Sequence, residues 1–190
     1  MRKLTTQTVR MYLAEQLNVD KYYDFFLTSY NLFKGINKKG YNLQLSLATI
    51  QLHFFKRNFK LAEELITGFP QQYDAKNGAK ELLEFYKNLI EIEKGHLNYI
   101  KKGKELLHEK DDIVFIEAIE KMFNDEVVDF VPANNLQQLI YHYFKMKYAI
   151  SQDKIASATA SAKTIENFNE NLYFVQEANH FLKGENNDRT

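Results

Sequence analysis

The sequence contains no cysteine, no tryptophan, two prolines and seven glycines among 190 residues. Without cysteine the chain cannot form a disulfide, use a thiol nucleophile or bind a metal through thiolates. So few prolines and glycines favour long helices joined by short turns over a fold of many strands. No apolar run approaches the roughly 20 residues of a membrane span, and the N-terminus lacks the apolar core of a signal peptide. We therefore expect a soluble, cytoplasmic protein.

The charged residues balance, because 25 lysines and arginines stand against 25 aspartates and glutamates. No overall field therefore favours nucleic acid or an anionic membrane surface. We predict no direct nucleic-acid binding by this chain and no membrane contact. Aromatic residues make up 14% of the sequence, as 15 Phe and 12 Tyr, so a chain of this length can bury a substantial core.

The stretch from Tyr41 to Phe69 has the clearest periodicity. Apolar residues recur at helical spacing in its first half, at Leu43, Leu47, Ile50 and Phe54, and again in its second half, at Phe59, Ala62, Ile66 and Phe69. Each set covers one face of an α-helix. Only residues 56–58 between the two sets are continuously polar. We predict an antiparallel helical hairpin, which needs neighbours of the same kind to bury its apolar face.

Similar patterns predict further helices along the chain. We expect them from about Thr6, over Tyr22–Phe33, Leu82–Lys94 and Leu97–Leu107, after Asp111-Asp112, and over residues 136–150, 155–165 and 170–183. Asp20 and either Asn134 or Asn135 are the expected N-caps, and residues 35–40 (GINKKG) are expected to form a turn. The apolar run Val127–Val131, just before Pro132, is either one turn of helix or an extended connector.

Together these patterns predict an all-α fold of about ten or eleven helices. Short turns near Asn58, Gly95 and Asp153 produce three similar hairpins, which is typical of an α-solenoid. The segments NFKLAEEL and DKIASATA resemble the start of the second helix in tetratricopeptide (TPR) repeats. We expect one TPR-like right-handed superhelix over residues 1–183, followed by a polar tail over residues 184–190.

The order of these features resembles a known family. The segment YLAEQLNVDKYYDFFLTSYNLF, the hairpin KRNFKLAEELI, the helix FIEAIEKMF and the small-faced helix leading into Asn167-Phe168 are similar to the C-terminal helical domain of Rgg/GadR/MutR-type transcriptional regulators of Gram-positive bacteria. The resemblance covers most of the chain but rests on residue types rather than on an invariant chemical motif. It implies a homodimeric sensor domain that binds a short signalling peptide on its concave face, as in quorum sensing.

The family reads DNA with an N-terminal helix-turn-helix, for which this chain has no room. The only local candidate is LAEQLNVDKYY, but an aromatic helix follows its turn where a recognition helix would need polar and basic side chains. We therefore expect either the sensor part of a regulator or a standalone adaptor or inhibitor that acts through protein–protein contacts.

No motif for catalysis, metal binding or a cofactor is present. The chain has neither the HExxH motif, nor a glycine-rich phosphate loop, nor a nucleophile-elbow serine, and its five histidines show no metal-ligand spacing on one helix. We predict a protein that is not an enzyme, with no cofactor and no metal site. A helical enzyme is the third and least favoured hypothesis.

The candidate binding residues are polar or aromatic side chains on the first helix of each predicted hairpin. They are Gln51, Asn88, Tyr141 and Lys145. Amide groups can hold a peptide backbone by paired hydrogen bonds, and aromatic rings can form pockets for its side chains. For any one of these residues, an ordinary surface role is the more frequent explanation. The expected ligand is a short peptide or a protein partner.

Overall fold

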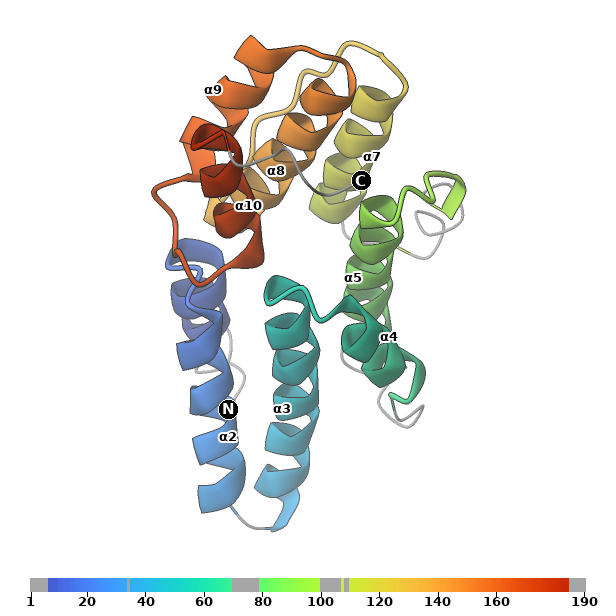
Figure 1. Cartoon of the computed structure of the whole chain (residues 1–190). Coiled ribbons are helices and arrows are strands. Elements are labelled where there is room, and N and C mark those ends of the chain that lie inside the picture. Colours follow the sequence, from blue (N-terminus) through green and yellow to red (C-terminus); the bar gives the residue numbers. More distant parts are fainter. Residues whose placement is uncertain (1–6, 34, 70–78, 100–106, 108–109, 185–190) are drawn as a thin grey trace. The chain divides into compact units, whose positions relative to one another are not determined.

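The computed structural model describes residues 7–33, 35–69, 79–99, 107 and 110–184 (Figure 1). These residues form nine helices and no strand, which confirms the predicted all-α class for this part of the chain. The helices are η1 (a π-helix, Val9–Glu15), α2 (Val19–Leu32), α3 (Gly35–Phe55), α4 (Phe59–Thr67), α5 (Ala79–Glu93), α7 (Lys110–Phe123), α8 (Asn135–Ser151), α9 (Ile155–Ile165) and α10 (Tyr173–Leu182). No described helix is both long enough and apolar enough to cross a membrane.

The chain divides into two compact units. One unit spans Asn18–Ile113, and the other joins Met1–Leu17 to Val114–Thr190. The single domain predicted over residues 1–183 stays a prediction. Of the predicted tail, only Gly184 lies within the described residues, and the predicted helix Leu97–Leu107 falls largely outside them.

The unit Asn18–Ile113 is built around the predicted hairpin, which the structure confirms as α3 and α4. The first-helix apolar positions Leu43, Leu47, Ile50 and Phe54 are all buried. Phe54 lies at the centre of an aromatic group, with ring centroids 5.0 Å from Tyr86 and 5.8 Å from Phe59. Arg57 turns the chain between the helices with a φ of 64°.

The other unit contains a second hairpin, α8 and α9, with α10 packed on it. Ala158 and Ala162 lie one turn apart on α9 and are fully buried, so this small-residue face lets the helices approach closely. Two asparagines tie the N-terminal segment to this unit: Asn135 donates from Nδ2 to the Glu15 carbonyl at 2.7 Å, and Asn169 donates to the Leu17 carbonyl at 3.3 Å. These bonds explain why residues far apart in sequence form one unit.

Two local predictions are wrong. Asp20 is not the N-cap of α2; Asn18 is, because its side chain accepts from the Lys21 N–H at 3.0 Å. Asp20 instead pairs with the Lys56 ammonium at 3.0 Å.

Residues 35–40 are not a turn but the first residues of α3. The N-terminal part of α3 is held against α2 by the Phe33 ring, which stacks on the Tyr41 ring with a centroid distance of 4.7 Å. Tertiary packing here outweighs the low helix propensity of glycine.

The N-terminus of α8 is capped by two side chains. Asn134 accepts from the Gln137 N–H at 3.0 Å, and the Gln137 side chain accepts from the Ala133 N–H at 2.9 Å. Of the two asparagines predicted as alternatives, Asn134 is therefore the cap. These bonds satisfy N–H groups that have no partner within the helix.

We predict that Asn134→Ala lowers the free energy of unfolding by about 1 kcal/mol, a typical loss for an N-cap. Asn134→Asp keeps the accepting oxygen and is the matched control, expected to stay near wild type. Urea denaturation followed by circular dichroism measures both. An equal loss in the two variants would show that the side-chain oxygen is not the stabilising group.

Candidate functional site

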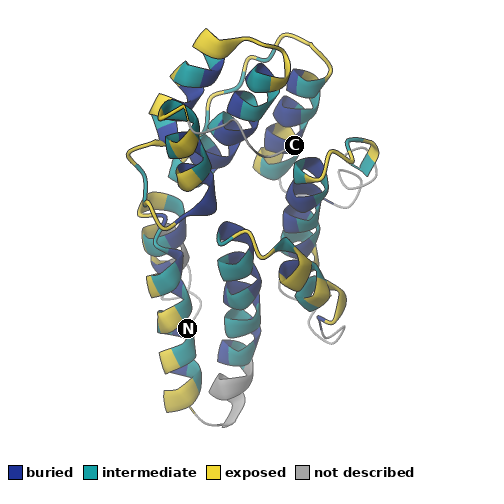
Figure 2. Ribbon diagram, in the orientation of Figure 1, coloured by how far each residue is buried: buried dark blue, intermediate teal, exposed yellow. Residues whose placement is uncertain are grey.

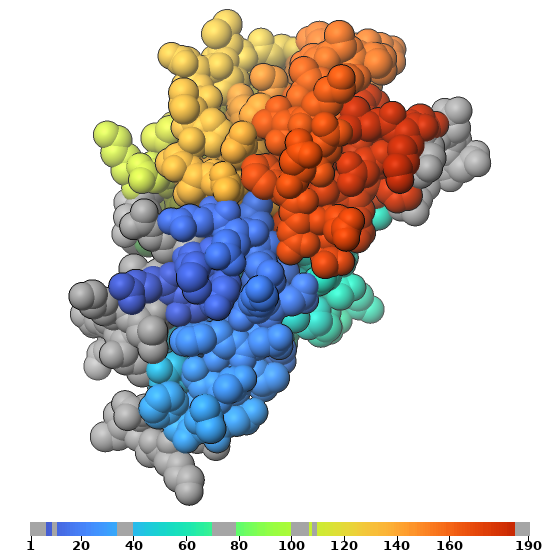
Figure 3. Space-filling model, turned by 90° about the vertical axis from the view of Figure 1, so that its left-hand side faces the viewer, coloured from blue at the N-terminus to red at the C-terminus, as the bar shows by residue number. Residues whose placement is uncertain are grey.

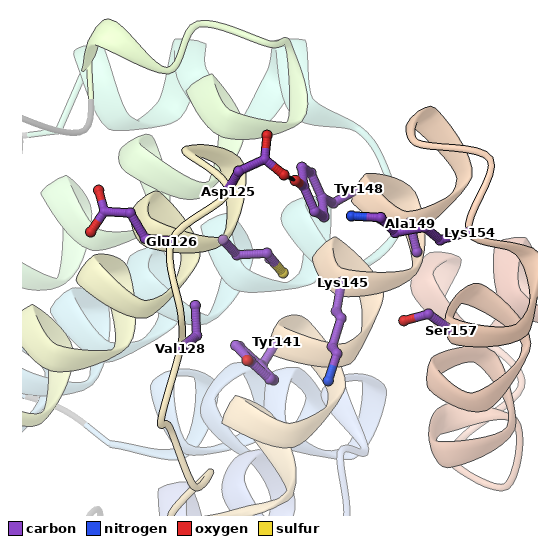
Figure 4. Close-up of a pocket in the computed structure, with 10 residues that line it drawn as sticks. Asp125, Glu126, Val128, Tyr141, Lys145, Tyr148, Ala149, Lys154 and Ser157 are labelled. Carbon is purple, nitrogen blue, oxygen red and sulfur yellow. Dashed lines mark hydrogen bonds between the residues drawn. The ribbon is translucent and has the colours of Figure 1, made fainter.

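The unit that contains α8 has a cleft of about 290 Å³. Its walls are the end of α7, the connector from α7 to α8, one face of α8 and the first turn of α9 (Figure 4). Of the α8 residues in the wall, Tyr141 is buried, with 6% of its surface exposed. Its polar lining residues are Asp125, Glu126, Tyr141, Lys145, Tyr148, Lys154 and Ser157. Met122, Val128 and Ala149 supply the apolar part of the lining.

Helix α8 presents three of the polar residues on one face. Tyr141, Lys145 and Tyr148 follow one another at offsets of four and three, which is the spacing of one helix face. The opposite face carries the buried residues Leu139, Tyr143 and Met146. The packing of that face fixes the rotation of α8 and so turns the three polar residues towards the cleft.

The tight turn after α8 brings Lys154 and Ser157 to the same cleft. Asp153 adopts a φ of 53°, and the Lys154 N–H then donates to the Ala149 carbonyl at 2.8 Å. This reversal places the start of α9 beside the end of α8. Figure 4 shows the Lys154 side chain directed back towards the Tyr148 ring, with its nitrogen 5.6 Å from the ring centroid.

The opposite wall begins where α7 ends. Asp125 has a φ of 59°, and the Glu126 N–H donates to the Lys121 carbonyl at 2.9 Å, so the chain leaves the helix sharply. The Asp125 carboxylate accepts a hydrogen bond from the Tyr148 hydroxyl (Figure 4). This hydrogen bond and the negative charge of Asp125 raise the pKa of Tyr148.

The two lysines of the cleft face rings rather than carboxylates. The Lys145 nitrogen lies 6.0 Å from the centroid of the Tyr141 ring, a weaker version of the contact between Lys154 and Tyr148. Among the described residues, neither ammonium group forms an ion pair or a hydrogen bond with a carboxylate. Both therefore keep their hydrogen-bond donors available.

This arrangement is suited to binding an anionic group beside apolar surface. Two ammonium groups and the Ser157 hydroxyl can donate to a carboxylate, and such charge-assisted bonds are stronger than neutral ones. The tyrosine rings, Met122 and Val128 can contact an apolar side chain. The cleft is small, with room for a few side chains of a ligand. No group of histidines or carboxylates among the described residues could hold a metal ion.

The structure separates the four predicted binding residues into two pairs. Tyr141 and Lys145 line the cleft. Gln51 and Asn88 belong to the other unit and are buried, with 3% and 0% of their surfaces exposed. Gln51 donates to the Tyr86 hydroxyl at 3.1 Å and Asn88 donates to the Glu84 carbonyl at 2.8 Å. Ligand binding by any of the four stays a prediction.

Five polar residues of the cleft were missed by the sequence analysis: Asp125, Glu126, Tyr148, Lys154 and Ser157. Tyr148 had a signal, since it lies three residues after Lys145 and seven after Tyr141. The other four had none, because they lie at or after turns with positive φ values, and such turns leave no periodic pattern.

No family model matches the chain, and no curated protein or solved structure is significantly similar to it.

His142 lies next to the cleft residue Tyr141 and contacts its ring edge-on at 5.5 Å. Its Nδ1 atom is buried and has no hydrogen-bond partner among the described residues. Burial and the positive charge of Lys145 lower the pKa of His142 below its ordinary value of 6.5. The folded protein therefore favours the neutral imidazole.

We predict that His142 makes the protein less stable in mild acid. As the pH falls through 6.5, the unfolded chain takes up the proton first, so stability is lost until the lower folded pKa is reached. Between pH 7.5 and pH 5.5 the melting temperature of His142→Asn should fall less than that of wild type. His180→Asn, at an exposed histidine, is the control. An identical pH dependence in wild type and His142→Asn would contradict the assignment.

Proposed function

We propose that the chain is a non-enzymatic sensor domain that binds a short peptide, or a peptide-like segment of a protein, in the cleft beside α8. The observation that carries this proposal is the presence of two ammonium groups without carboxylate partners beside tyrosine rings. A ligand with a carboxylate next to an apolar side chain fits these groups.

The hairpins support a solenoid architecture for this domain. Helices α3 and α4 reverse direction through a three-residue turn, and α8 and α9 do the same. Each turn contains one residue of positive φ, Arg57 or Asp153, and each second helix carries a buried alanine near its start, Ala62 or Ala158. Stacked repeats of one helical hairpin build an α-solenoid, so the two similar hairpins support the proposal of a TPR-like right-handed superhelix.

In the organism, we propose that the domain serves a transcriptional regulator of the Rgg type. The support is the family-like order of sequence features from Tyr12 to Phe168. In this role a peptide signal binds the helical domain, the domain forms a homodimer, and a helix-turn-helix outside this chain reads DNA. Intact mass of the native gene product would separate this role from that of a standalone adaptor of 22.4 kDa.

Peptide binding in the cleft can be tested with two pools of random heptapeptides, one with free carboxyl termini and one amidated. Affinity selection on the immobilised protein, read by mass spectrometry, should retain members of the free-acid pool preferentially. Lys145→Ala and Lys154→Ala should each weaken the binding of a retained peptide by about three- to tenfold, as expected for loss of one charge-assisted hydrogen bond in a solvated cleft. Lys163→Ala, an exposed lysine of α9 outside the cleft, is the matched control and should bind like wild type.

The proposal is wrong if neither pool is retained above the background of a blank surface. It is also wrong if the Lys145→Ala, Lys154→Ala double variant retains the same peptides with the same affinity while its circular dichroism spectrum is unchanged. A pull-down with the full-length protein gives the alternative outcome. If it recovers one cellular protein in stoichiometric amount and no peptide competes with that protein, the adaptor function replaces peptide sensing.

A further inference from the structure

The connector from α7 to α8 is extended rather than helical. Residues 126–132 contain no helical turn, which resolves the choice that the sequence left open for Val127–Val131. Exposure alternates along it: Val128 and Phe130 are partly buried, while Val127, Asp129 and Val131 are exposed, the two valines to 95% and 82% (Figure 2). Alternation with a period of two is the pattern of a β-strand with one covered face.

The connector is fixed along its length. At its start the Glu126 N–H is bonded to α7, and at its end the Ala133 N–H donates to the Gln137 side chain at 2.9 Å. In the middle, the Phe130 ring lies between Phe115 and Tyr141, with centroid distances of 5.7 and 5.1 Å. A segment held at both ends and at its centre is already ordered before anything binds to it.

The backbone of this ordered segment is unpaired. Within the described part of the chain, no hydrogen bond joins an N–H or carbonyl group of Val127–Val131 to another residue. Figure 3 shows the yellow atoms of the connector region at the surface, beside the orange atoms of α9. Val128 also lines the cleft, so the segment forms part of the cleft wall opposite α8.

We propose that Val127–Val131 is a strand without a partner and that the peptide bound in the cleft adds to it as a second, antiparallel β-strand. Backbone hydrogen bonds to a preordered edge bring affinity at a low cost in conformational entropy. This inference rests on the proposed function and specifies the conformation and side-chain pattern of its ligand.

The exposed face of the strand defines that pattern. Val127, Asp129 and Val131 point outward at alternate positions, so residues paired opposite them share this face. An opposite charge facing Asp129 and apolar residues facing the two valines are favourable cross-strand pairs. The expected ligand is therefore an extended peptide that contains a lysine or arginine. A β-branched apolar residue lies two positions before this basic residue, and another lies two positions after it.

A second copy of this chain fits the edge less well. The antiparallel register that overlaps all five residues is centred on Asp129, and its two-fold axis places the Asp129 of each copy opposite the other. Like charges directly opposite in a sheet are destabilising. The edge is thus protected against self-association by an exposed charge, a common feature of strand edges that avoid aggregation.

A designed heptapeptide tests the strand. It carries valine at positions two and six, lysine at position four, threonine elsewhere and a free carboxyl terminus. Addition to the ¹⁵N-labelled full-length protein should shift the amide resonances of Val127–Val131 and slow the hydrogen exchange of alternate amides among them. Alternate amides of a strand point to opposite edges. Two methylated forms of the peptide are therefore compared, one N-methylated at the valines and the lysine and the other at the threonines. One form should lose binding, because its methyl groups block the paired edge, and the other should bind like the unmodified peptide.

Charge exchange gives a second test. The Asp129→Lys variant should bind the lysine peptide about fivefold more weakly than wild type does. It should prefer a peptide that has glutamate in place of lysine at position four. Asp24→Lys, at an exposed aspartate of α2, is the matched control and should show neither effect.

Three results would overturn the inference. The first is the absence of any change at the amides of Val127–Val131. The second is equal binding of the peptides with both patterns of N-methylation. The third is a wild-type dimer, seen by sedimentation velocity, that is lost in Val127→Lys or Val131→Lys, because the edge would then belong to a second copy. If free-acid pool peptides still bind in a way that depends on Lys145 and Lys154, only the strand is rejected and the proposed function stands.

Discussion

The contact on which the candidate site depends is the insertion of Phe130 between Phe115 and Tyr141. The connector has no helical hydrogen bonds of its own, and two of its three valines are largely exposed, so this ring is its main apolar anchor. The ring also fills the space between α7 and α8. Because a side chain of the connector occupies that space, the two helices are held apart there, and the cleft lies next to the gap between them. The extended backbone of the connector and the cleft beside it therefore both depend on the position of the Phe130 ring.

Helix periodicity predicted the hairpins, because burial of one helix face is a local property of the sequence. Leu43, Leu47, Ile50 and Phe54 needed no knowledge of their neighbours to be assigned to the core. The boundaries were harder to predict. Gly35 and Gly40 are unfavourable in a helix, and only packing against α2, which the sequence does not display, lets α3 begin at Gly35. Asn18 and Asp20 are both good caps, and the choice between them is made by the position of Lys56 as much as by propensity.

The candidate site was predictable only where it lies on a regular helix. Tyr141 and Lys145 share a face of α8, so the sequence places them together; Lys154 and Asp125 arrive through turns with positive φ values at Asp153 and Asp125. Gln51 lies on a regular helix, but the sequence does not show whether its side chain is exposed. At the edge of an apolar stripe, a polar residue is either exposed or bonded inside the core, and the sequence does not distinguish these cases. Here Tyr86, from another helix, offers its hydroxyl, and Gln51 is buried against it.

The cleft contains both lysines and an aspartate, but they form no ion pair with one another. Asp125 lines the same cleft as Lys145 and Lys154, and an ion pair at such a solvated site would add at most about 1 kcal/mol to stability. Instead, Tyr148 donates its hydroxyl to Asp125, and Figure 4 shows the carboxylate directed to that hydroxyl. This hydrogen bond gives the carboxylate a partner that is not a lysine, and the tyrosine rings contact the ammonium groups without neutralising them. Among the described residues neither lysine is paired with a carboxylate, so both ammonium groups can donate to a carboxylate of a bound ligand.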